Sequence, residues 1–215
     1  STTTTPTTSS TTSTVVTTST TSTTLPTETV LGKSYVVKDP APGSDPSLRS
    51  VVVLGKELTS DDTITGNPLI DGATVEVIAN GASPTDQVFA LPAGASVAGS
   101  PGWKALGSPV TGYSYKDSLG ANGPVKAALI KKAGSGTFVV KVTAKGALGP
   151  GPQPHIMVVP PAPGTDGGIR FTINGGAIYC VAFGGAAGGT VTNAPSGTFN
   201  KVFKIVGATT ETGCP

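Results

Sequence analysis

Two cysteines and one histidine limit the chemistry available to this chain. Cys180 and Cys214 are the only cysteines among 215 residues, and His155 is the only histidine. Two thiols and one distant imidazole make a poor zinc site, because structural zinc is held by four ligands. Cys214 lies beside the end of the sequence, where a chain would otherwise fray. We therefore predict a Cys180–Cys214 disulfide rather than a metal site or free thiols.

The residues needed for catalysis are sparse. A Ser–His–Asp triad would have to use His155, which stands between Pro154 and Ile156, and no Gly-x-Ser-x-Gly turn accompanies it. The aspartates lie mostly in or near turns, where Asp is common for its local backbone hydrogen bonds. A glycosidase needs two carboxylates facing each other across a cleft, and sequence spacing does not show such a pair. We expect no enzymatic activity.

Calcium is the one metal that the loops could hold. Asp39, Asp45, Asp61 and Asp62 fall in expected loops and could supply oxygen ligands. Their spacing matches neither an EF-hand nor an Asp-rich repeat. We expect no cofactor, with calcium as the alternative.

Three aromatic residues are the best candidates for stacking on a ligand. Trp103 stands in a turn-rich stretch, and Tyr113 and Tyr115, two residues apart, would point to one face of a strand. A carbohydrate-binding module would stack such rings on sugars. The same three side chains would also fill a core well, because Trp and Tyr bury large areas. We favour the core.

The elements that position these residues are predicted to be strands. From Val30 onward, short β-branched runs alternate with Gly and Pro clusters, with hardly any helical periodicity. Short strands at this spacing are typical of an all-β fold, and we predict an antiparallel β-sandwich, Ig-like or jelly-roll-like. The expected strands are 30–38, 48–54, 73–79, 87–91, 112–116, 125–131, 137–144, 155–159, 168–173, 177–183 and 198–206.

Two of these strand pairs are predicted to form hairpins. One joins 125–131 to 137–142 across a Gly-rich turn, and the other joins 169–173 to 177–181 around Asn-Gly-Gly. We expect residues 30–215 to form one sandwich body. A subdivision near 146–168, which is rich in Pro and Gly, is the alternative, although the chain after Pro163 is small for a core of its own.

Residues 1–29, here called the arm, differ from the body in composition. Up to Thr24, every residue except Pro6, Val15 and Val16 is Ser or Thr. Such a segment buries too little to offset an ordering cost of roughly 1–2 kcal/mol per residue, so we expect it to be extended. The candidate O-glycosylation sites are Thr2, Thr3, Thr4, Thr5, Thr7, Thr8, Ser9, Ser10, Thr11, Thr12, Ser13, Thr14, Thr17, Thr18, Ser19, Thr20, Thr21, Ser22, Thr23 and Thr24.

Short motifs in the body resemble those of a group of bacterial proteins. Around GYSYKD (112–117), YCVAFGG (179–185) and the terminal Cys-Pro, the chain resembles uncharacterised secreted proteins of environmental bacteria that carry Ser/Thr-rich stretches. The resemblance implies an extracellular or cell-surface location and no known chemistry. In composition the arm also resembles mucin-type O-glycosylated stalks.

Charge and hydropathy argue against two classes of partner. The 14 basic and 12 acidic residues leave a net charge of +2, and the cations form no dense run in the sequence. We therefore expect no nucleic-acid partner, because a phosphate backbone is bound by clustered Lys and Arg. No apolar run approaches the roughly 20 residues of a transmembrane helix, so no membrane span is expected.

Two functions are predicted from an extended arm on a β-rich body. The favoured one is a structural subunit of an extracellular, self-assembling filament or surface coat, with copies of itself and covalent glycans as partners. There the Thr-rich arm adds to a sheet edge of the neighbouring subunit, with Val15 and Val16 as its anchor. The alternative is a carbohydrate-binding or adhesin module raised on a glycosylated stalk.

Overall fold

The computed structural model describes residues 1–2, 24–147 and 154–215. Of the candidate glycosylation sites, only Thr2 and Thr24 are among these, and both are exposed. The remaining candidates and the proposed anchor, Val15 and Val16, lie outside the described residues.

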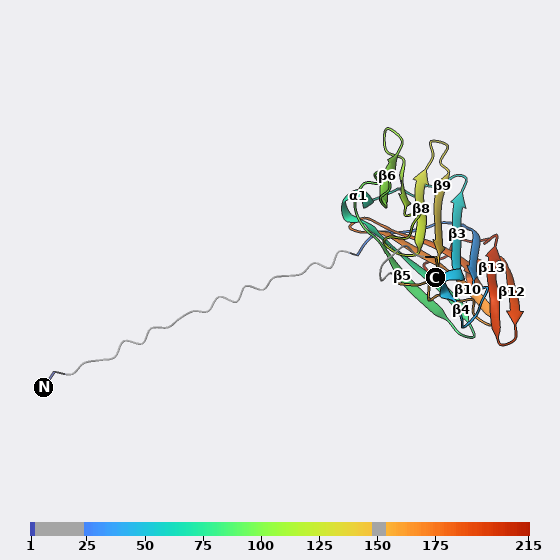
Figure 1. Cartoon of the computed structure of the whole chain (residues 1–215). Coiled ribbons are helices and arrows are strands. Elements are labelled where there is room, and N and C mark those ends of the chain that lie inside the picture. Colours follow the sequence, from blue (N-terminus) through green and yellow to red (C-terminus); the bar gives the residue numbers. More distant parts are fainter. Residues whose placement is uncertain (3–23, 148–153) are drawn as a thin grey trace.

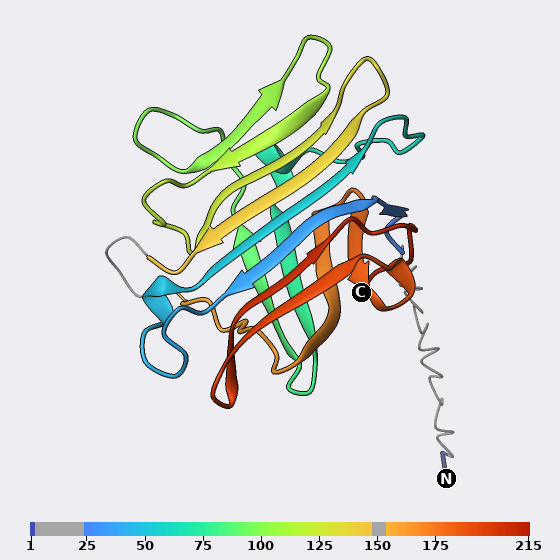
Figure 2. The ribbon, with the colours of Figure 1, turned by 90° about the vertical axis from the view of Figure 1, so that its right-hand side faces the viewer.

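Two β-sheets stack face to face, which confirms the predicted sandwich (Figure 1). In strand order, the smaller sheet contains β1 (Thr27–Thr29), β11 (Ile178–Gly184), β10 (Gly164–Ile173), β4 (Ala73–Gly81) and β5 (Thr85–Leu91). The larger sheet contains β12 (Thr190–Ser196), β13 (Phe199–Val206), β2 (Gly32–Lys38), β3 (Ser50–Glu57), β9 (Phe138–Lys145), β8 (Val125–Lys132), β7 (Gly112–Lys116) and β6 (Gly102–Leu106). Figure 2 shows the eight-stranded sheet in front, its strands crossing those of the five-stranded sheet behind.

Within the described residues, helical structure is confined to three single turns next to strands. These are η1 (Pro46–Leu48), α1 (Pro68–Asp71) and η2 (Gly185–Ala187). In α1, the side chain of Asn67 accepts a hydrogen bond from Leu69 N, and Pro68 supplies a preset first helical residue. No helix in the described part of the chain is long and apolar enough to cross a membrane.

The core lies between the sheets and is built from every second side chain. Along β9, Val140 and Val142 are fully buried while Lys141 is exposed. The five-stranded sheet contributes Ile169 and Phe171 from β10 in the same way. Strands from the last third of the chain therefore belong to both sheets, because β10 pairs with β4 and β13 pairs with β2.

Both predicted hairpins are confirmed, and three strands were missed. β8 pairs with β9, and β10 with β11, antiparallel in each case. β6 was missed because Gly and Pro flank it on both sides. β12 was missed because it contains Pro195 and is mostly exposed, and β1 because it lies in the polar arm.

The prediction of a strand at 155–159 is wrong, although buried and exposed side chains do alternate along this segment. Ile156 and Val158 are buried, whereas His155 and Met157 are exposed. The backbone of this segment bonds to a side chain instead of a strand: Gln87 Nε2 donates to His155 O at 2.9 Å, and Met157 N donates to Gln87 Oε1 at 2.6 Å. An extended segment can thus complete the core without joining a sheet.

The end of the arm is part of the five-stranded sheet. β1 runs parallel to β11, with Glu28 opposite Tyr179. The pairing continues on both sides, since Ile178 N donates to Pro26 O at 2.8 Å and Val30 N donates to Cys180 O at 2.8 Å. The arm defined by composition therefore overlaps the folded body by at least one strand.

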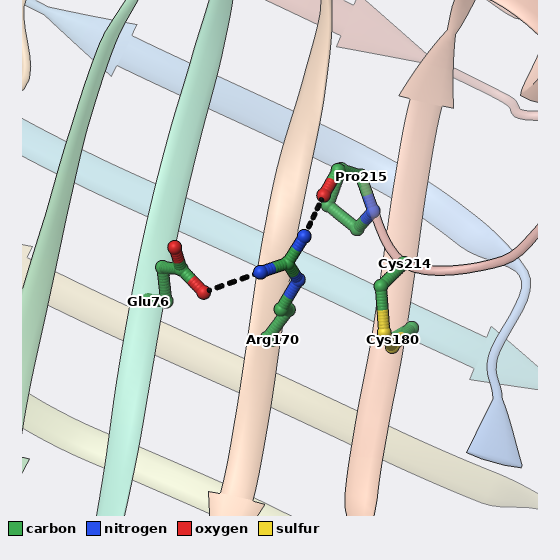
Figure 3. The surroundings of a disulfide bond; sticks show 5 residues. All are labelled: Glu76, Arg170, Cys180, Cys214 and Pro215. Atoms are coloured by element: carbon green, nitrogen blue, oxygen red, sulfur yellow. Dashed lines mark hydrogen bonds and ion pairs between the residues drawn. A yellow bond between two sulfur atoms is a disulfide. The ribbon is translucent and has the colours of Figure 1, made fainter. Parts of the chain in front are cut away.

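The predicted disulfide between Cys180 and Cys214 is confirmed, with 4.8 Å between the two Cα atoms. It holds the last residues against β11, on the outer face of the five-stranded sheet (Figure 3). Arg170, on the neighbouring strand β10, donates from Nη2 to Pro215 O at 2.7 Å and pairs through Nη1 with Glu76 at 3.0 Å. β11 is thus held by the arm at its edge and by the C-terminal tail on its outer face.

Replacing both cysteines by alanine should destabilise the protein without changing its fold. The bond closes a loop with a sequence separation of 34, for which the chain-entropy estimate is about 3–4 kcal/mol of unfolding free energy. Urea unfolding of the double variant and the wild type measures the difference, with reduced wild-type protein as the control. A difference below about 1 kcal/mol would contradict this role for the bond.

Candidate functional site

All twelve lysines of the sequence lie on strands of the eight-stranded sheet. They are Lys33, Lys38, Lys56, Lys104, Lys116, Lys126, Lys131, Lys132, Lys141, Lys145, Lys201 and Lys204. The same eight strands carry a single carboxylate, Glu57, which is buried. The strands of the five-stranded sheet carry no lysine, four carboxylates and Arg170. The fold therefore separates charges that are mixed in the sequence.

Strand alternation places eight of these lysines on the outer face of the sheet. Lys141 and Lys145 point outward because Val140, Val142 and Ala144 between and beside them fill the core. The register of the paired strands places these eight lysines on the same side of the sheet, and we call this set the lysine face. Its members are Lys38, Lys56, Lys104, Lys116, Lys131, Lys141, Lys145 and Lys204.

No two lysines stand directly opposite each other in the register. Lys141 faces Leu129 on one side and Leu54 on the other, and Lys145 faces Ser50. Like charges directly opposite would be destabilising. Neighbouring lysines are instead diagonal or two strands apart, at spacings of about 7–10 Å. The result is an open lattice of positive charge.

The lysine face is not neutralised by carboxylates within the described residues. The two ion pairs found there use arginine, Arg49 with Asp39 and Arg170 with Glu76. Among the lysines, only Lys132 donates a side-chain hydrogen bond in this part of the chain, to Asp62 O at 2.8 Å. The face is therefore free to attract anions from solution.

A groove of about 840 Å³ lies on the lysine face over β7, β8 and β9. Four lysines line it: Lys116, Lys126, Lys141 and Lys145. Leu129, from the middle strand, lies among them. A smaller hollow of about 450 Å³ adjoins it and shares Lys116 and the residues Ser118 and Leu119.

A buried aspartate holds the loop between groove and hollow. Asp117 accepts from Ala121 N at 2.9 Å and from Asn122 N at 2.8 Å, one with each carboxylate oxygen. Its own N–H donates to Lys126 O at 2.9 Å. Because both carboxylate oxygens accept backbone hydrogen bonds, Asp117 fixes the loop that presents Leu119.

The predicted stacking residues lie in or against the core. Trp103 and Tyr115 are 1% and 2% exposed, and their ring centroids are 5.2 Å apart. Trp103 Nε1 donates to Pro92 O at 3.0 Å, so its polar atom is satisfied inside the protein. Tyr113 is on the same inner side and half-buried. With these faces covered, Trp103 and Tyr115 cannot stack on a sugar in this fold.

The candidate calcium ligands are not brought together. Asp39 pairs with Arg49 at 3.0 Å, and the side chain of Asp45 accepts from Ser47 N at 2.9 Å. Asp61 and Asp62 lie elsewhere, after β3. Over residues 1–2, 24–147 and 154–215 there is no group of three or more His, Cys, Asp and Glu that could hold a metal ion.

Acidic residues do meet near the base of the arm. Burial raises the pKa of Asp62 to about 7, helped by the nearby charges of Glu57 and of Glu28 in β1. Burial and the same glutamate, Glu57, also raise the pKa of Glu211. Glu57 accepts from Leu31 N at 2.7 Å. Carboxyl groups from the arm, β3 and the C-terminal tail are therefore close enough to affect one another's ionisation.

Comparison with family models, with curated proteins and with solved structures finds no match to this chain. The resemblance to secreted Ser/Thr-rich bacterial proteins therefore stays an expectation.

The lysine face was missed from sequence. Its signal is present in alternating runs such as Lys141-Val142-Thr143-Ala144-Lys145. Each run contributes one or two charges, however, and the cluster forms only when β6, β7, β8, β9, β3, β2 and β13 are placed side by side. Judged by linear density alone, the lysines looked dispersed.

Asp62→Asn should change how stability depends on pH. The folded-state pKa of Asp62, about 7, lies above the usual unfolded value of about 3.9. Folded protein therefore holds this proton more tightly between these pH values, and wild-type stability falls as pH rises through the window. Urea unfolding at pH 4.5 and 8 should show a larger loss for wild type than for Asp62→Asn. Equal losses would contradict the assignment.

Proposed function

We propose that this protein is an extracellular adhesive module that binds an acidic polysaccharide through the lysine face, with the arm as its stalk. One observation carries the proposal: the fold gathers every lysine onto one sheet and leaves that sheet without exposed carboxylates. A disulfide is compatible with an oxidising, extracellular setting. The glycans expected on the arm are part of the same proposal.

A charged polymer suits this face better than a small anion. The lysines are spread over seven strands, so a small anion would meet one or two of them. A polymer contacts many at once and releases its bound counterions, which makes binding strong at low salt and weaker as salt rises. Each contact can be weak, because the linked contacts raise one another's effective concentration.

Three features favour a polysaccharide over nucleic acid. Duplex DNA carries one charge per about 1.7 Å of its axis, much denser than the lysine spacing of about 7–10 Å. The outward positions carry Lys rather than Arg, which is the side chain suited to bidentate phosphate contacts. The aromatic rings of β6 and β7 face the core and offer no platform for bases.

Self-assembly is kept as a second proposed function, because the described part of the chain has sheet edges without a partner strand. These edges are the outer sides of β1, β5, β6 and β12. β1 already joins β11 as an added strand, so the arm can supply main-chain hydrogen bonds to an edge. The same addition between subunits would build a filament or coat.

Binding to polygalacturonate tests the first proposal. Wild-type protein should bind the immobilised polymer at 50 mM salt, bind much less at 300 mM, and ignore neutral dextran. Changing Lys38, Lys104, Lys131 and Lys141 together to Gln should reduce the slope of log K against log salt, by up to about 0.7 for each lysine that contacts the polymer.

Two results would overturn this proposal. One is binding that does not depend on salt or that equals binding to dextran. The other is a preference for duplex DNA over polygalacturonate in direct competition, which would make nucleic acid the ligand.

Deleting residues 1–24 tests the second proposal. The deletion spares β1, so the body should keep its unfolding transition. If the arm connects subunits, sedimentation velocity should show polymer for the full chain and monomer for the truncated one. Polymer that survives the deletion would show that the arm is not the connector.

A further inference from the structure

The groove over β7, β8 and β9 brings four lysines together around one hollow. Lys116 comes from β7, Lys126 from β8, and Lys141 and Lys145 from β9. Elsewhere on the face, Lys38 and Lys204 lie on neighbouring strands and do not line this groove. Four cations around one hollow give it a stronger local attraction for anions than a flat lattice has.

A β-bulge adds the fourth lysine to the groove. In the pairing of β8 with β9, Val125 faces Ala144 and Ala127 faces Thr143, so Lys126 is the extra residue. A bulge of this kind re-aims a side chain that regular alternation would turn to the core. Lys126 is therefore half-buried on the groove wall rather than beneath the sheet.

The floor of the groove combines apolar side chains with side chains that carry hydroxyl groups. Ala127 and Leu129 of β8 form its middle, flanked by Ser114 of β7 and Thr143 of β9. Leu119, 70% exposed, stands at the rim on the loop that Asp117 fixes. This combination offers carbon surface, hydroxyls and cations within one hollow, and the loop is already in place before any ligand binds.

We infer that this groove is the subsite for a short run of uronate sugars within the acidic polysaccharide. The inference rests on the proposed function. The ring carboxylates would pair with Lys116, Lys141 and Lys145, while the apolar C–H face of a ring lies on Leu129. Ring hydroxyls would meet Ser114 and Thr143. A uronate chain supplies this alternation of carboxylate, hydroxyl and C–H surface along its length.

The test compares two double variants that each lose two lysine charges with a third variant that keeps the charge of the wild type. Lys141→Gln/Lys145→Gln removes two charges inside the groove, and Lys38→Gln/Lys204→Gln removes two from the same face outside it. Leu129→Ser removes the apolar floor and leaves the charge unchanged. Urea unfolding checks that each variant is folded, and the probe is an oligogalacturonate of four to six sugars in 150 mM salt.

We expect the groove pair to weaken binding at least 10-fold and the outer pair less than 3-fold. Leu129→Ser should weaken binding of the oligomer 3- to 10-fold, while the slope of log K against log salt stays that of the wild type. In NMR titrations, the amide shifts should concentrate at 126–129 and 141–145, and not at 36–38 and 202–204.

The failures of the two proposals are distinguishable. Equal losses from the two lysine pairs, or shifts spread over the whole sheet, would overturn the groove assignment while leaving the adhesive function in place. Wild-type protein that binds neither oligomer nor polymer would overturn both. Binding of inorganic phosphate with the same shifts and equal affinity would show a general anion site and overturn the assignment to uronate.

Discussion

Every second side chain of the eight-stranded sheet must fill the space between the two sheets, and this constraint decides where the charges can go. Burying a lysine without a partner is costly, because its ammonium loses its hydration. Lysine is therefore confined to outward positions, to bulges such as Lys126, or to strand ends such as Lys132. The same alternation that builds the core from Val140 and Val142 builds the lysine face on the reverse side.

β11 has a corresponding role in the other sheet, because the end of the arm and the C-terminal tail are both held there. β1 pairs with its edge, and the disulfide fastens the C-terminal tail to its outer face. Arg170 adds a second attachment for the tail on β10. The attachment of the arm through β1 and the lysine face thus belong to different sheets.

Features that depend on local pattern could be predicted from the sequence, and those that depend on strand order could not. β7 was predicted with its observed bounds because GYSYK begins with Gly and its two tyrosines alternate with other residues. The disulfide could be predicted because there are only two cysteines. The segment 155–159 alternates as a strand does, but pairing is decided by its neighbours, and Gln87 takes its backbone bonds. The groove could not be predicted, because it depends on the strand order β7, β8, β9 and on a β-bulge at Lys126 that no residue type indicates.

The net charge of +2 conceals this organisation, since it averages a basic sheet with carboxylates that lie elsewhere. What a ligand meets is the local field, which acts over a Debye length of about 8 Å at physiological salt. The composition of the arm matters for the same reason. Residues 1–24 carry no charged side chain, so they neither attract the lysine face nor repel a polyanion that approaches it. Glu28, the one acidic residue of the arm, belongs to the carboxyl cluster at its base. Under the proposed function, an arm without charged side chains would leave the lysines available to an anionic polymer.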